Sequence, residues 1–329
     1  MPLPRLLMLS LGGTITMTAN AGGGIAPTLG AEDLIAAVPG LGAVARIDAR
    51  SPLRLPSPSL ALDHVVAVAA EIRAAFAEGV DGAVVIQGTD TIEETAFALD
   101  LLLPGDRPVV VTGAMRGPQS PGAEGPANLL AAAQVAASPE ARGLGALAVL
   151  NDEIHAARFV RKGHTALTSA FVSDNGGPLG LLAEGRVRLF SRVAPLDLPG
   201  LDAIDGALPA VALVKIAMGD DGRLLRAVPQ LGFSGVVIEG MGAGHVPAGM
   251  ADLVGEVAAT LPVALATRTL SGPVFTNTYG YAGSEIDLVG RGVMPAGFLS
   301  PVKARLLLTL ALAARLDRET IARAFKAFG

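Results

Sequence analysis

Two threonines in this chain each follow a glycine turn at the end of an apolar run, an arrangement that can present a nucleophile. Residues 6–11 lead into Gly12-Gly13-Thr14, and residues 81–86 lead into Gly88-Thr89-Asp90. A threonine hydroxyl is a weak nucleophile at neutral pH and needs a base or a hydrogen-bond relay. Glycines let the backbone approach a ligand closely and leave N–H groups free to hold an oxyanion. The two junctions together therefore favour a site built on hydroxyl groups.

The second junction also has a purely structural interpretation. Threonine and aspartate are the usual N-cap residues, and Thr91 with Glu94 predicts a capping box for a helix that ends near Leu103. Residues 81–86 are typical of a buried parallel strand, however, and ligands bind at the carboxyl ends of such strands. Thr89 and Asp90 would then lie where a ligand binds.

Further motifs extend along nearly the whole chain. In order they are Gly12-Gly13-Thr14-Ile15, Gly88-Thr89-Asp90-Thr91 with Glu93-Glu94-Thr95, Gly113-Ala114-Met115-Arg116, Gly125-Pro126 with Asn128, Asn151-Asp152, Lys162, Gly177-Pro178-Leu179-Gly180, and Ser300-Pro301 with Lys303-Ala304-Arg305. By their order and spacing the chain resembles the bacterial-type L-asparaginases. These are homotetrameric amidohydrolases that cut a side-chain amide through a threonine nucleophile.

The resemblance implies the catalytic roles. Thr14 is expected to be the acylated nucleophile, and Thr89, Asp90 and Lys162 a second relay in which Asp90 also pairs with the substrate ammonium. Without this context a lone lysine such as Lys162 would be a solvated surface charge. A lysine must be neutral to act as a base. Burial favours the neutral amine and a nearby carboxylate favours the charged form, so the sequence leaves the protonation state open.

Two serines are the expected contacts of the substrate's polar end. In Pro56-Ser57-Pro58-Ser59, Ser57 matches the serine that the family uses to bind the substrate carboxylate. Pro58 stands where glutamine or a similar polar residue usually follows, and it has no side-chain donor or acceptor. Weaker substrate binding is therefore expected unless Ser59 compensates. The alternative is a plain proline-rich turn.

Two residues late in the chain are expected to act across a subunit interface. His245 stands in Gly240-Met241-Gly242-Ala243-Gly244-His245, where the family frequently has asparagine in a loop that reaches a neighbouring subunit's site. This segment lacks the third glycine of a dinucleotide fingerprint. Glu285 matches the glutamate that crosses the interface to the substrate's amino group. An exposed loop glutamate is the alternative.

The lid differs from the family pattern. Family members often carry a tyrosine in the loop after the first strand, whereas residues 17–26 contain none, and the chain's only tyrosines are Tyr279 and Tyr281. The run Gly22-Gly23-Gly24 suits a mobile lid that closes on the substrate. The sequence leaves open which group assists Thr14.

Chain length and periodicity predict two α/β domains. At 329 residues the chain exceeds the size at which one core stops growing. We expect a larger N-terminal parallel-sheet domain over 1–190, a linker rich in Pro, Asp, Gly and Leu over 191–209, and a smaller C-terminal α/β domain over 210–329. Strands are predicted at 6–11, 44–47, 83–86, 108–112, 144–150, 210–216, 235–239 and 262–267, and helices at 64–78, 248–260, 300–314 and 317–328.

Composition excludes several classes of function. The formal net charge is −5 and there is no Lys/Arg run, so a nucleic-acid partner is not expected. There is no cysteine, and the four histidines lack the spacing of a zinc site, so no metal or other cofactor is expected. No apolar run approaches the roughly 20 residues that span a bilayer. The apolar run at 6–11 is shorter than a signal-peptide core of about 7–15 residues, which favours a cytoplasmic location.

The leading hypothesis is an L-asparagine amidohydrolase that forms aspartate and ammonia through an acyl-threonine intermediate. It would need no cofactor and would act as a homotetramer of dimers that share active sites. A glutaminase-asparaginase that also accepts L-glutamine, or an amidase of broader specificity, are alternatives of the same class. A non-catalytic amino-acid-binding protein on this scaffold is an alternative of another class. A nucleotide-binding oxidoreductase is a third, which the incomplete glycine fingerprint disfavours.

Overall fold

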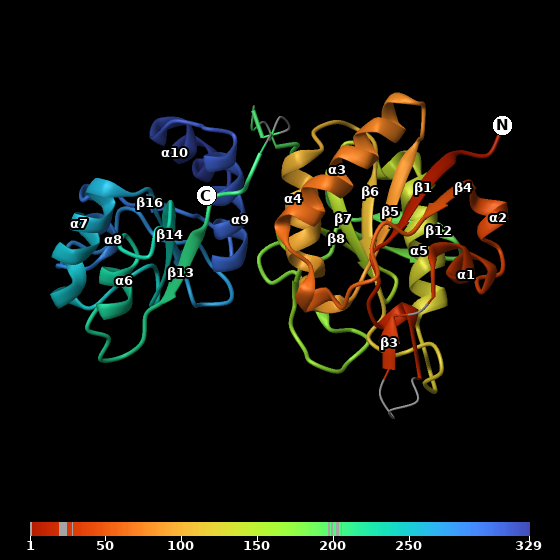
Figure 1. Ribbon diagram of the computed structural model, residues 1–329, viewed down its shortest axis with the longest axis horizontal. Helices are drawn as coiled ribbons and strands as arrows, with labels where there is room; N and C mark the ends of the chain where they lie inside the picture. The colour runs from red at the N-terminus through yellow and green to blue at the C-terminus, as the bar shows by residue number, and fades with distance from the viewer. Residues whose placement is uncertain are drawn as a thin grey trace. The chain divides into compact units, whose positions relative to one another are not determined.

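The computed structural model describes residues 2–19, 25–27, 29–196, 198, 200–201, 204 and 206–329. They form two compact units, Met1–Asp197 and Leu198–Gly329, which can be followed by colour along the chain in Figure 1. The division falls inside the segment 191–209 that the sequence predicts as a linker. Positions 197, 199, 202, 203 and 205 of that segment, and the predicted lid glycines Gly22-Gly23-Gly24, lie outside the described residues.

The N-terminal unit is built on an eight-stranded sheet. Its strands are, in spatial order, β12 (Arg186–Leu189), β11 (Gly180–Ala183), β8 (Glu153–Ala156), β7 (Ala146–Leu150), β6 (Val109–Thr112), β5 (Gly82–Ile86), β1 (Arg5–Ser10) and β4 (Arg46–Arg50). The strands from β7 to β4 are mutually parallel, as predicted. The sheet is therefore mostly parallel, and only the strands β8, β11 and β12 at its other edge pair in an antiparallel way.

Tight turns explain the antiparallel edge. Asn151 and Asp152, with φ of 52° and 61°, connect β7 to β8, and Glu184 and Gly185, with φ of 51° and 69°, connect β11 to β12. Two central residues with positive φ form the hairpin turn that matches the twist of antiparallel strands. A parallel pair would have needed a crossover of a dozen or more residues.

Helices cover both faces of this sheet (Figure 1). α3 (Leu62–Ala77) and α4 (Ile92–Leu102) lie on one face, and α1 (Ala31–Ala36), α2 (Leu41–Val44) and α5 (Gly125–Ala137) on the other. Every residue of β5, β6 and β7 is buried, because side chains on both faces of the central strands meet a helix. The helix predicted at 64–78 is confirmed as α3. The strand predicted at 44–47 is wrong at its start, because Val44 ends α2 and β4 begins at Arg46.

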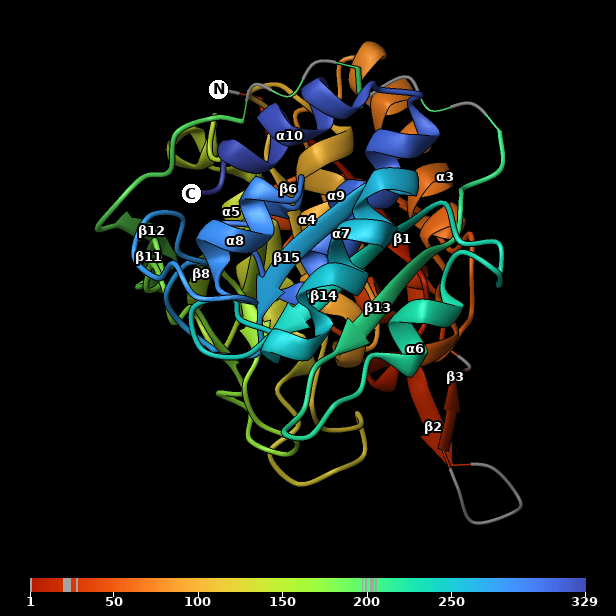
Figure 2. The same cartoon turned by 90° about the vertical axis from the view of Figure 1, so that its left-hand side faces the viewer.

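The C-terminal unit is a smaller parallel α/β fold. Its sheet has the order β13 (Val211–Lys215), β14 (Gly235–Gly240), β15 (Val263–Thr267) and β16 (Met294–Pro295), and Figure 2 shows β13, β14 and β15 side by side. The helices are α6 (Arg223–Ala227), α7 (Ala251–Thr260), α8 (Glu285–Gly290), α9 (Pro301–Ala313) and α10 (Arg318–Lys326). The predicted strands and helices of this unit are confirmed, with shifts of a few residues at their ends.

Two short antiparallel pairs complete the fold. β2 (Met17–Ala19) pairs with β3 (Ile25–Pro27), and β9 (Arg161–Lys162) pairs with β10 (Phe171–Val172). The second pair positions Lys162, as described below. Within the described residues, no helix combines the length and the apolar character that crossing a membrane requires.

Candidate active site

The two glycine turns touch each other at the carboxyl edge of the N-terminal sheet. β1 and β5 are adjacent, with Ser10 opposite Ile86, so both turns leave the sheet at the same edge. Gly13 has a φ of +89°, and a Cβ built on it would lie 2.0 Å from the backbone nitrogen of Gly88. Only glycine allows this approach, because any side chain would collide with backbone. The turn glycines therefore bring the segments of Thr14 and Thr89 together.

Thr14 begins a short 3₁₀ turn, Thr14–Thr16. Thr16, at the other end of this turn, is fully buried and its hydroxyl donates to the Gly13 carbonyl over 2.8 Å. Thr14 is only half-buried. Of Thr14 and Thr16, the predicted nucleophile Thr14 is thus the more exposed.

Ser57 anchors the second junction. It lies in the 3₁₀ turn η2 (Ser57–Ser59) and is 3% exposed, and its hydroxyl accepts the Asp90 backbone N–H over 3.2 Å. Its carbonyl accepts the Thr91 hydroxyl over 3.3 Å. Ser59, on the same turn, is exposed. The structure therefore gives Ser57 a positioning role, and its predicted contact with a substrate carboxylate stays a prediction.

The predicted capping box is wrong, although its helix is confirmed. α4 ends at Leu102, with Leu103 as its C-cap, and Thr91 is its N-cap residue without a side-chain capping bond. The Thr91 hydroxyl instead donates to Ser57 and accepts from the Gln87 amide at 3.1 Å. The turn that carries Thr89 and Asp90 is thus tied to Ser57, which holds both residues in place.

Lys162 joins the two functional groups of this turn. Its Nζ lies 2.8 Å from the Thr89 hydroxyl and 2.6 Å from Oδ1 of Asp90. The Lys162 side chain is only 17% exposed. The alternative of a solvated surface lysine is therefore wrong. The Asp90 side chain is 55% exposed, which leaves this carboxylate open to a cationic ligand.

A buried asparagine supports the same sheet edge. The Asn128 side chain donates to the Gly113 carbonyl over 2.9 Å and accepts the Asn151 backbone N–H over 2.9 Å. It thereby connects α5 to the segments that follow β6 and β7. Asn128 therefore has a structural role, because its side chain bonds to the backbone of Gly113 and of Asn151 and leaves no group for a ligand in these two contacts.

The remaining predicted residues form a separate cluster in the C-terminal unit. The Glu285 side chain is fully buried, so the alternative of an exposed loop glutamate is wrong. Its Oε1 accepts the backbone N–H groups of Tyr279 (2.6 Å) and Thr278 (2.9 Å), and its Oε2 lies 3.2 Å from Nε2 of His245. The other nitrogen of the His245 ring, Nδ1, lies 3.1 Å from the Tyr281 hydroxyl.

The charge of Glu285 follows from these contacts. Burial raises the pKa of the Glu285 carboxyl, but the N–H donors of Tyr279 and Thr278 and the His245 ring outweigh burial and hold the pKa below its ordinary value. Glu285 is therefore an ionised acceptor. No pattern in the sequence links Tyr279 and Tyr281 to His245. Both tyrosine rings lie against the imidazole, with centroids 5.0 and 5.6 Å away.

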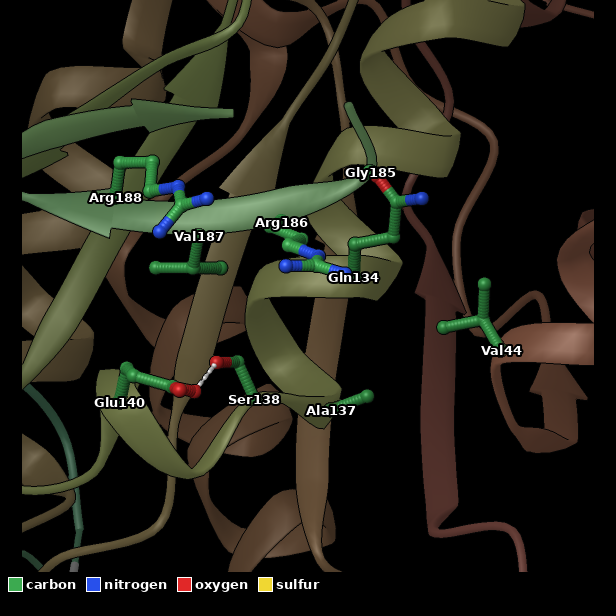
Figure 3. A pocket seen from close by; sticks show the side chains of 9 residues that line it. All are labelled: Val44, Gln134, Ala137, Ser138, Glu140, Gly185, Arg186, Val187 and Arg188. Atoms are coloured by element: carbon green, nitrogen blue, oxygen red, sulfur yellow. Dashed lines mark hydrogen bonds between the residues drawn. The ribbon is translucent and has the colours of Figure 1, made fainter. Parts of the chain in front are cut away.

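A pocket of about 490 Å³ lies on the N-terminal unit, and Figure 3 shows the side chains that line it. Its lining includes Arg186 and Arg188 of β12 and Gln134 near the end of α5. The end of α5 packs at the first residue of β5, where a Cβ on Gly82 would lie 2.3 Å from the Ala136 carbonyl oxygen. This pocket is therefore remote from the threonine turns.

Comparisons with known proteins identify the family. The family model "Asparaginase, N-terminal" matches residues 5–195, and "Glutaminase/Asparaginase C-terminal domain" matches residues 210–325. An L-asparaginase of Bacillus licheniformis is 34% identical over 94% of this chain and 95% of its own length. A probable L-asparaginase of Deinococcus radiodurans is 38% identical over 98% and 97%. The crystal structure of a probable cytoplasmic L-asparaginase from Campylobacter jejuni is 32% identical, with a TM-score of 0.85 over 98% of this chain and 99% of that one. Since both family models match and together cover most of the sequence, this chain belongs to the asparaginase family.

Proposed function

We propose that this protein hydrolyses the side-chain amide of L-asparagine to L-aspartate and ammonia. The observation that carries the proposal is the bridge from Lys162 to the Thr89 hydroxyl and the Asp90 carboxylate, beside the Thr14 turn. A partly buried amine that contacts a hydroxyl and a carboxylate provides the relay that hydroxyl chemistry needs. The similarity to the Bacillus L-asparaginase and to the probable L-asparaginase of Deinococcus supports asparagine as the substrate.

Each residue has a distinct role in the proposed reaction. The Thr14 oxygen attacks the amide carbon, the carbon–nitrogen bond breaks, and ammonia leaves with the proton that Thr14 gave up. Water then hydrolyses the acyl-threonine ester. Thr89, Lys162 and Asp90 move protons in these steps, and Asp90 pairs with the substrate ammonium. Ser57, with Ser59, binds the substrate carboxylate.

The proposed assembly is a homotetramer of dimers that share active sites. The N-terminal domain, residues 1–190, supplies the threonines, and the C-terminal domain, residues 210–329, supplies His245 and Glu285 to a neighbouring subunit's site. A cytoplasmic location is also proposed, and the similarity to the probable cytoplasmic L-asparaginase of Campylobacter supports it. No cofactor takes part in the proposed chemistry.

L-glutamine is the second candidate substrate, because the matching C-terminal family model is named for both glutaminase and asparaginase. Ammonia release from asparagine and from glutamine, measured without added cofactor, tests the proposal. Thr14→Ala and Thr89→Val should each lose at least 90% of the rate, which corresponds to about 1.4 kcal/mol or more of transition-state stabilisation. Thr260→Ala, which removes an exposed hydroxyl at the end of α7, is the control. A folded protein that binds asparagine but releases no ammonia would instead be the amino-acid-binding alternative.

A further inference from the structure

We propose that Glu124 is a positioning residue for amide hydrolysis, because it fixes the segment after β6 against Ile15 and thereby sets the place of the Thr14 hydroxyl. This role rests on the proposed function, and it uses contacts within the N-terminal unit alone. It also connects two sequence motifs that lie outside the lysine–threonine contact, Gly113-Ala114-Met115-Arg116 and Gly125-Pro126.

The segment that follows β6 lies against the turn that carries Thr89. β6 is adjacent to β5, with Thr112 opposite Ile86, and the Gln87 backbone N–H donates to the Thr112 carbonyl over 3.0 Å. A Cβ built on Gly113 would lie 2.3 Å from the Gln87 carbonyl oxygen, so a side chain there would collide with backbone. The segment that begins at Gly113 therefore leaves the sheet at the same edge as the two threonine turns.

Glu124 closes this segment at its base. It is the N-cap residue of α5, and its carbonyl accepts the Asn128 backbone N–H over 2.9 Å. Its side chain reaches back to the start of the segment, where Oε1 accepts the Met115 backbone N–H and Oε2 accepts the Arg116 backbone N–H over 3.3 Å. Hydrogen bonds to a carboxylate are roughly twice as strong as those between neutral groups. These two bonds, called the Glu124 clamp below, therefore tie the exit of β6 to the first turn of α5.

The clamped segment packs against the residue next to the proposed nucleophile. Ile15 follows Thr14 in the 3₁₀ turn and is 3% exposed. A Cβ built on Gly125 would lie 2.9 Å from Cγ1 of Ile15 and 3.4 Å from Cβ of Ala114. The Ile15 side chain and Ala114 therefore both lie against Gly125, the residue that follows Glu124 in the chain.

Ile15 also adjoins empty space. A cavity of about 60 Å³ is lined by Ile15 together with Leu29 and Leu34, among other residues. A side chain beside a cavity has no partner atoms on that side, so the contact with Gly125 is needed to hold Ile15 in place. Without the Glu124 clamp, Ile15 can shift into the cavity and displace Thr14. A displacement of about 1 Å in a reacting group can lower the rate roughly 100-fold.

Two substitutions of Glu124 test this role. Glu124→Gln keeps the shape of the side chain but turns an N–H₂ group toward one of the two backbone N–H donors. It should lower kcat for asparagine at least about 10-fold, with KM changed by less than about threefold, because the hydroxyl must be in place in the transition state. Glu124→Asp keeps both acceptor oxygens and should be at least about threefold faster than Glu124→Gln. A Glu124→Gln enzyme that keeps more than about a tenth of the wild-type kcat, or a Glu124→Asp enzyme that is equally slow, overturns the proposal.

Asp317→Asn is the matched control. It alters the carboxylate of another helix N-cap residue, which accepts the Thr320 backbone N–H over 2.7 Å in the C-terminal unit. Its kcat should stay within about threefold of wild type. A loss equal to that of Glu124→Gln would show a general effect of lost stability and would overturn the role of Glu124.

A double-mutant cycle tests whether the effect reaches Thr14 through Ile15. Ile15→Ala removes the side chain that lies against Gly125. Adding Glu124→Gln to this variant should lower kcat by less than about threefold, because residues that act along one path are not additive. A loss of about threefold or more in the Ile15→Ala background would separate the effect of Glu124 from Ile15 and overturn the proposal.

Amide hydrogen exchange tests the Glu124 clamp without reference to activity. The Met115 and Arg116 amides should exchange at least about 10-fold faster in Glu124→Gln than in the wild type, and at the wild-type rate in Asp317→Asn. Equal exchange in the wild type and Glu124→Gln overturns the clamp. A wild type that releases no ammonia overturns the proposed function and this role with it. An active wild type with an equally active Glu124→Gln variant overturns the role of Glu124 alone.

Discussion

Lys162 and Thr89 meet through a 2.8 Å contact between Nζ and Oγ1, although 73 residues separate them in the chain. Thr89 follows β5, at the carboxyl edge of the sheet, and Lys162 lies on the short strand β9 outside it. The same amine also contacts Asp90, so one side chain bonds to both the hydroxyl and the carboxylate. The candidate chemistry therefore depends on tertiary structure rather than on a local motif.

Lys162→Met should reduce turnover far more than affinity, because a proton relay acts in the transition state. We expect kcat for asparagine to fall at least about 100-fold, with KM changed only a few-fold. Steady-state kinetics provide the measurement. Lys215→Met is the matched control, because it removes an equally short ion pair, to Glu239 at 2.6 Å, from a lysine that is 63% exposed. A Lys162 variant that raised KM alone would show that the residue binds substrate instead.

Gly13→Ala should destabilise the N-terminal unit and abolish activity. The new Cβ would lie 2.0 Å from Gly88 nitrogen at a φ of +89°, so the clash adds to backbone strain of about 1–3 kcal/mol. Urea unfolding should report a loss of at least that size. Gly42→Ala is the control, since nothing lies within 4 Å of a Cβ at this helical position. It should be neutral or stabilising by up to about 1 kcal/mol. Equal stability of the two variants would contradict the close approach of the turns.

His155 should make stability depend on pH. It is 1% exposed on β8, and burial lowers its pKa from 6.5 to about 4. Between these values the unfolded chain binds the proton and the folded chain does not, so stability is full above pH 6.5 and falls as the pH drops toward 4. From pH 7.5 to 5.0 the loss should be on the order of 2 kcal/mol. Urea unfolding of wild type and His155→Gln at both pH values measures it. Parallel losses in the two proteins would show that His155 contributes nothing to the slope.

The parts that sequence predicts well are those that local patterns determine. The runs before Gly12 and Gly88 are apolar because helices cover both sheet faces, and the glycines are required where two turns collide. The strands β1 and β5 and the turns after them can therefore be predicted from a few consecutive residues each. The hairpin at Asn151-Asp152 also has a local signal, since Asn and Asp tolerate positive φ. The alternation of strands and helices along the chain favours a parallel sheet and hides this signal.

The parts that sequence predicts poorly depend on distant partners. Thr91 looked like the first residue of a capping box, but Ser57, 34 residues earlier, takes its hydroxyl. The contact of Tyr281 with His245 spans 36 residues and lies in a segment without helical or strand periodicity. Only the resemblance to a family, and not any local pattern, indicated Lys162. Such contacts between distant side chains can be identified only from the three-dimensional structure of the loops.

Pro58→Gln should tighten asparagine binding. Pro58 is exposed in the Ser57–Ser59 turn beside the Asp90 loop, and it has no side-chain donor or acceptor. One additional hydrogen bond of about 1 kcal/mol would lower KM about fivefold. Asparagine kinetics of the variant, with Pro56→Gln on the adjacent exposed proline as the control, measure the effect. An unchanged KM in a folded Pro58→Gln variant would show that Ser59 or the backbone already makes the contact.

Subunit mixing gives the sharpest test of the shared site. If each site takes Thr14 from one chain and Glu285 from its neighbour, Thr14→Ala and Glu285→Gln oligomers should each be poorly active. A mixed pair places both mutations in one site and leaves the other intact, because a two-fold interface contributes the same patch twice.

The mixed pairs should therefore recover up to roughly half of the wild-type activity, measured as ammonia release after mild dissociation and reassembly. A mixture of Thr14→Ala with Lys162→Met is the control, because both residues belong to the N-terminal unit and every site of a mixed pair keeps one lesion. The control should recover nothing. If verified mixed oligomers of the first pair are no more active than the average of their parents, Glu285 does not act across the interface and the shared site is wrong.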